Sequence, residues 1–72
     1  MTRKDFTLIA NALGTELRYA DPGAEWGAIW NTTHKIAHAL AHTNPRFDRE
    51  RFIQHVKDVA TGRRTVEGNL VA

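Results

Sequence analysis

The chain contains no cysteine among its 72 residues, so it can form neither a disulfide nor a thiolate zinc site. It also lacks any apolar run near the roughly 20 residues that a membrane-spanning helix requires. The charged opening residues are not followed by the apolar stretch of a secretory signal peptide. We therefore expect a soluble protein of the cytoplasm that has no membrane partner.

Helix-breaking residues are scarce as well, with two prolines and five glycines. Apolar residues instead recur at three- and four-residue steps, the period of an amphipathic helix. This period predicts helices over residues 3–19, 23–43 and 49–61. Short connections between helices favour antiparallel neighbours, so the sequence predicts an all-α three-helix bundle in a single domain, residues 1–62.

Residues typical of helix starts precede each predicted helix. Thr2 and Asp5 have the spacing of a capping box, in which each side chain accepts a hydrogen bond from the other residue's backbone. Asp21 followed by Pro22 suits an N-cap and first helical position. Asp48 is the expected N-cap of the third helix.

The inward stripes of the three helices supply the expected core. Phe47 and Phe52 flank the third helix start at the spacing of a hydrophobic staple. Gly14 costs about 1 kcal/mol relative to Ala inside a helix, which suggests that another backbone passes close to it. A large aromatic side chain can bury about 150–250 Å², so the tryptophans should hold much of the core. The expected centre comprises Phe6, Ile9, Leu13, Trp26, Trp30, Ile36, Leu40, Phe52 and Val56.

The first predicted helix carries a second apolar stripe, formed by Leu8, Ala12, Thr15 and Tyr19. A surface helix needs only one such stripe, so the second indicates a partner. A chain this short buries only about 60% of the surface that its unfolded form exposes, and self-association would add to a marginal core. We expect a homo-oligomer that uses this stripe. The alternative is that Leu8 and Tyr19 are scattered surface residues of the ordinary kind.

Gly62 can adopt the left-handed conformation that ends a helix, and residues 63–72 follow as a tail. Two small apolar patches surround a Gly68-Asn69 turn signal in this segment. The tail is expected to be flexible or docked on a partner. Disorder is favoured, because terminal segments are usually poorly ordered.

The sharpest local pattern is a row of histidines, His34, His38 and His42, at four-residue steps. Imidazoles one helical turn apart can chelate a metal ion, but Lys35 stands where zinc-protease helices carry a glutamate. The alternative is a row of partly exposed histidines beside the buried stripe, and we predict no metal site and no cofactor. No spacing indicates a catalytic Ser, His and Asp set, and so short a chain has little room for an enclosed cleft. We expect no enzyme activity.

A basic cluster gathers around the third predicted helix: Arg46, Arg49, Arg51, Lys57, Arg63 and Arg64. Such a helix can enter the major groove of DNA when it belongs to a helix-turn-helix. However, the net charge is only +2, and Glu50 and Asp58 share the outward face with these cations. DNA binding by an accessory or regulatory protein is therefore the alternative function.

The opening MTRKDFTLIANAL and the corner NPRFDRERF together resemble short uncharacterised proteins encoded by bacteriophages and prophages. The matching pattern covers residues 1–10 and 41–52, about a third of the chain, and the resemblance carries no established activity. It implies a small accessory protein of the infected bacterial cell. The leading hypothesis is a non-enzymatic protein that binds a host or phage macromolecule, with a protein as the favoured partner.

Overall fold

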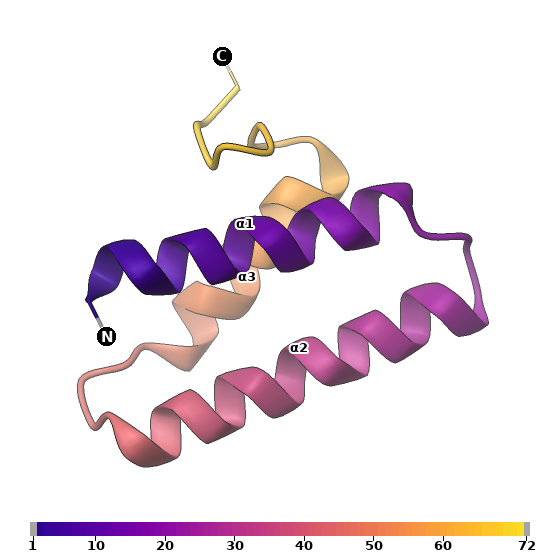
Figure 1. The fold of residues 1–72 in the computed structure, drawn as a ribbon. Helices are drawn as coiled ribbons and strands as arrows, with labels where there is room; N and C mark the ends of the chain where they lie inside the picture. Colours follow the sequence, from indigo (N-terminus) through magenta and orange to yellow (C-terminus); the bar gives the residue numbers. More distant parts are fainter. Residues whose placement is uncertain (1, 72) are drawn as a thin grey trace.

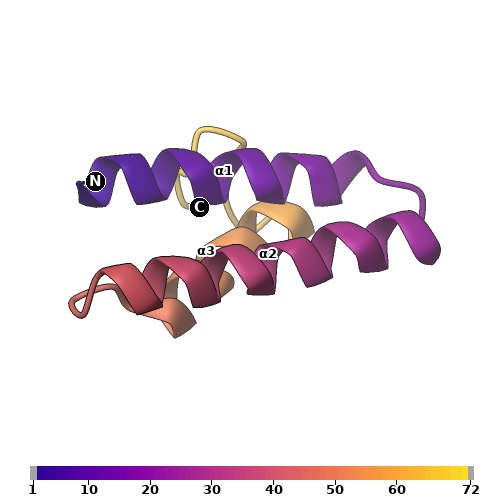
Figure 2. The same cartoon turned by 60° about the horizontal axis from the view of Figure 1, so that its bottom comes forward.

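The computed structural model describes residues 2–71 and confirms the all-α, three-helix prediction. The helices are α1 (Arg3–Tyr19), α2 (Ala24–Thr43) and α3 (Arg49–Thr61). Figure 1 shows α1 and α2 running side by side in opposite directions, with α3 crossing behind α1 at an angle. The Cα atoms span 33 × 30 × 15 Å, so the molecule is flat, as the second view also shows (Figure 2).

Two of the predicted helix starts are confirmed. The Thr2 hydroxyl accepts a hydrogen bond from the Asp5 backbone N–H at 3.3 Å, and the Thr2 N–H donates to Asp5 Oδ2 at 2.9 Å. The bond from the Thr2 N–H favours the ionised carboxylate and is the main cause that lowers the pKa of Asp5 below its usual value. Asp48 Oδ1 accepts from the Arg51 N–H at 3.0 Å and caps α3. Gly62 ends that helix in the left-handed conformation, with φ 86°.

The start predicted for the second helix is wrong in its detail. Asp21 and Pro22 are not its N-cap and first residue; they belong to a turn that precedes α2. Gly23 is the N-cap, with φ 99°, and makes no side-chain capping bond. This positive φ is open to glycine but strained for other residues, so the chain turns at Gly23 before the helix begins.

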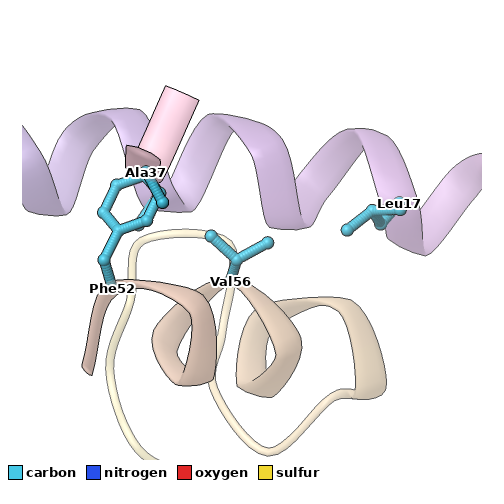
Figure 3. Packing of buried hydrophobic residues seen from close by; sticks show 5 residues of the cluster. Leu17, Ala37, Phe52 and Val56 are labelled. Atoms are coloured by element: carbon cyan, nitrogen blue, oxygen red, sulfur yellow. The ribbon is translucent and has the colours of Figure 1, made fainter. Parts of the chain in front are cut away.

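The core lies mainly between α1 and α3. Its buried apolar side chains are Ala10, Leu17, Ala37, Phe52, Val56 and Val59. Figure 3 shows Phe52 beside Ala37 of α2, while Val56 points from α3 toward α1. Gly14 is buried against α3, where a Cβ atom would lie 2.5 Å from Val59 Cβ. The close approach expected at this glycine is confirmed.

The expectation that the tryptophans anchor the core is wrong for Trp26, which is 37% exposed. Trp30 is half-buried and packs against the edge of the core. The two indole rings stack on each other along α2, with centroids 5.4 Å apart. Only Thr33 and Ala37 of α2 are buried. The reason is that α3 packs more extensively against α1 than it does against α2, which leaves the first half of α2 at the edge of the core. The other residues expected at the centre lie at the core or pack against it.

Candidate binding surfaces

The outer stripe of α1, defined as Leu8, Ala12, Thr15 and Tyr19, remains largely uncovered. Leu8 is 57% exposed and Tyr19 is 74% exposed, while Ala12 is also exposed. Thr15 is half-buried, and its hydroxyl donates to the Asn11 carbonyl at 2.7 Å. The stripe thus presents a large apolar or aromatic side chain at each of its two ends and small residues between them.

The segment 63–71 folds back on its own chain and lies beside α1 (Figure 1). It forms a tight reversal in which the Gly68 N–H donates to the Thr65 carbonyl at 2.8 Å. The Val71 N–H donates to the Arg63 carbonyl at 3.0 Å, and Arg64 forms an antiparallel bridge with Leu70. The reversal leaves Leu70 70% exposed and Val71 56% exposed. More apolar surface is therefore carried by the segment that docks on α1.

Asn11 anchors this segment from α1. Its Nδ2 donates to the Glu67 carbonyl at 3.0 Å, and its Oδ1 lies 2.6 Å from Nε2 of His55 on α3. Gly68 packs closely against the same side chain, since a Cβ atom at this position would lie 2.6 Å from Asn11 Oδ1. Partial burial and the charge of Arg64 lower the pKa of His55, which favours the neutral imidazole as the donor to Asn11.

Arg18 provides a second anchor near the other end of α1. Its Nη2 donates to the carbonyls of Val59, at 2.7 Å, and Arg64, at 2.6 Å. A cation is favourable beside the last carbonyls of a helix, so this guanidinium stabilises the end of α3 while it holds the tail. Sequence reasoning did not single out Asn11 or Arg18 as functional or structural sites. The only signal in the sequence was that these two polar residues lie two helical turns apart, each between apolar neighbours.

The residues of the predicted basic cluster lie in different environments. Arg64 is half-buried, donates to the Gly68 carbonyl at 2.7 Å and lies 3.7 Å from a carboxylate oxygen of Asp58. Arg46 and Arg51 line a hollow together with Arg3, a cation outside the predicted cluster. The remaining cations are exposed elsewhere: Arg49, Lys57 and Arg63. A second hollow mixes carboxylates with arginines, since Asp48, Glu50 and Asp58 line it beside Arg51 and Arg64.

The histidine row lies along α2, where all three side chains are exposed. His34 packs its ring edge-on against Trp30, with centroids 4.9 Å apart. Within residues 2–71, the structure has no group of three His, Cys, Asp or Glu side chains arranged to hold a metal ion. In the same range, no helix has both the length and the apolar character needed to cross a bilayer.

Comparisons with known proteins give no further guide to function. No protein-family model matches the chain. No curated protein and no solved structure is similar to it either. Its function is therefore inferred from the surfaces described above.

Proposed function

We propose that this chain is a non-enzymatic binding protein that acts by contacting another protein, and that a second copy of itself is one such partner. The observation that carries this proposal is the exposure of Leu8 and Tyr19 on the outer stripe of α1. Large apolar and aromatic side chains that remain in water on one face of a helix are favourable contacts for a facing helix. Ala12 between them permits a close approach.

The surface area of the molecule supports self-association. Its accessible surface is 5136 Å². A monomer of this mass typically exposes about 4,500 Å², so the flat fold leaves roughly 600 Å² more in water. Stable interfaces commonly bury about 800 Å² on each partner, and the excess is of the same order. A two-fold dimer through α1 would place the outer stripe of each copy against that of the other.

The docked tail does not cover the outer stripe of α1 within one chain. Its anchors are Asn11 and Arg18, which face α3 and the tail, while Leu8, Ala12 and Tyr19 remain exposed. Leu70 and Val71 add exposed apolar side chains to the same docked segment. An identical chain is the simplest molecule that could cover both the outer stripe and the exposed side chains of the tail.

The resemblance of the chain to phage-encoded proteins supports a role in the cytoplasm of an infected bacterium, with a host or phage protein as a further partner. DNA binding is the less favoured function. Carboxylates of Asp48, Glu50 and Asp58 lie among the cations of α3, where they would face phosphates. A sequence-specific complex with duplex DNA at physiological salt that is weakened by Arg51→Gln would favour DNA binding over protein binding.

Light scattering after size-exclusion chromatography tests the proposed interface. We expect the intact protein to elute as a dimer, and the double variant Leu8→Glu, Tyr19→Glu to elute as a monomer with an unchanged helical circular dichroism spectrum. Ala39→Glu is the control for an added negative charge, because it places one glutamate at an exposed position of α2. If the double variant remains dimeric, or if Ala39→Glu disrupts the dimer equally, the outer stripe is not the interface.

A further inference from the structure

A hollow of about 350 Å³ opens between the first half of α1, the corner that joins α2 to α3, and the start of α3. Aromatic rings contribute much of its lining. The rings of Phe6 and Phe47 meet edge to face with centroids 4.8 Å apart, and Phe47 and Phe52 lie 5.3 Å apart. Phe52 is buried, while Phe6 and Phe47 are half-buried, so apolar ring surface remains available to an occupant.

Three arginines line the same hollow: Arg3 from the start of α1, Arg46 from the corner and Arg51 from α3. Across residues 2–71, none of them forms an ion pair with a carboxylate. Asp48 is the one acidic residue in the lining, and its Oδ1 already accepts the capping bond from the Arg51 backbone. The lining therefore holds three arginines and one carboxylate, and the arginines are not ion-paired within the described residues.

We propose that this hollow binds an anionic group, a carboxylate or a phosphate, carried on a compact body that includes an aromatic ring. Guanidinium groups recognise both anions through paired N–H donors. The aromatic lining provides edge and face contacts for a ring. Its volume lies at the lower end of small-molecule sites, which limits the occupant to one ring with its charged group.

This site is independent of the proposed protein interface. The α1 residues that line it are Arg3, Phe6, Thr7 and Ala10, none of which belongs to the outer stripe. The rest of the lining comes from residues 44–52 and from His55, which also lie outside the outer stripe. Loss of self-association would leave the hollow intact, and an empty hollow would leave the interface intact.

Amide chemical-shift mapping by NMR on the full chain tests this site. The probes are N-acetyl-phenylalanine, which carries a ring and a carboxylate, its neutral amide, and phenyl phosphate. We expect the carboxylate and phosphate probes to shift the amides of the lining residues in a saturable way. The neutral amide should bind at least about tenfold more weakly, since it cannot form charge-assisted bonds with the arginines. Whichever anionic probe binds more tightly identifies the preferred charged group.

Substitutions separate this site from general attraction of anions to a basic surface. Arg46→Gln and Arg51→Gln should each weaken binding of the preferred probe by about tenfold, whereas Arg49→Gln, at an exposed arginine outside the lining, should weaken it less than about twofold. The backbone cap of α3 is retained in Arg51→Gln, and Arg46 lies outside the helices, so both variants should fold. Equal binding of the neutral amide, shifts centred elsewhere, no saturable shift with either anion, or an equal loss in Arg49→Gln would overturn the proposal.

Discussion

Replacing Gly14 with alanine tests how closely α1 and α3 pack. A Cβ atom at this position would lie 2.5 Å from Val59 Cβ and 2.8 Å from the Val56 carbonyl oxygen. Neither neighbour can move freely, because the first is a side-chain atom attached directly to the backbone of α3 and the second belongs to that backbone. The helices must separate locally to admit the methyl group.

The expected effect is the sum of two opposed terms. Alanine is favoured over glycine inside a helix by about 1 kcal/mol. Overpacking a core by one carbon typically costs about 1–3 kcal/mol, and contacts with rigid atoms place this site near the upper end. We therefore expect Gly14→Ala to lower the free energy of unfolding by about 2 kcal/mol. For a domain of this size, that change lowers the Tm by roughly 8–16 °C.

Gly27→Ala is the matched control, since Gly27 is also helical but no atom lies within 4 Å of the position that a Cβ would take there. It should raise the free energy of unfolding by about 0.5–1 kcal/mol, the gain from helix propensity alone. Thermal denaturation followed by circular dichroism measures both variants. A Gly14→Ala variant that is as stable as the unchanged protein, or more stable, would refute the close packing of α1 on α3.

Three further predictions follow from burial and hydrogen bonding. Leu17→Ala should lower the free energy of unfolding by about 2–5 kcal/mol, because Leu17 is buried. Trp26→Ala should lower it by less, because Trp26 is partly exposed. Equal losses of stability for the two variants in urea denaturation would contradict this prediction. Asn11→Ala should lower the free energy of unfolding by about 1–3 kcal/mol and speed amide hydrogen exchange in the tail, because the bonds of Asn11 to Glu67 and His55 are lost. Unchanged exchange in the tail would contradict the role of Asn11 as its anchor. The pKa of His55 is lowered in the fold, so its contribution to stability is complete above pH about 6.5 and is lost as pH falls from there toward the folded pKa. His55→Gln should reduce this loss in Tm between neutral and mildly acidic pH, and an unchanged pH dependence would exclude His55 as its source.

The local features of the fold could be predicted from sequence. The capping box at Thr2, the Asp48 cap and the Gly62 end depend on residues within a few positions of one another, and the structure confirms them. The close contact at Gly14 was also predictable, because a glycine inside an apolar helix stripe is unfavourable without a packing reason. Only the identity of the neighbouring helix was missing from that prediction.

Features that depend on the relative placement of helices could not be predicted in the same way. Periodicity places Trp26 on the inward stripe of α2, but α3 covers α1 more fully and leaves that end of α2 at the edge. The position of the tail depends on bonds from Asn11 and Arg18 to backbone carbonyls more than forty residues away. Likewise, Arg3 joins Arg46 and Arg51 only because the start of α1 lies beside the corner. No sequence period encodes these contacts.

Sedimentation equilibrium of the intact protein over a range of concentrations most directly tests the central proposal that the chain binds protein through α1. The weight-average mass should rise with concentration from the 8.1 kDa of one chain toward twice that value. Removal of the exposed Leu8 and Tyr19 side chains from water provides the driving force for this association. A mass that stays at 8.1 kDa across the range would contradict the account.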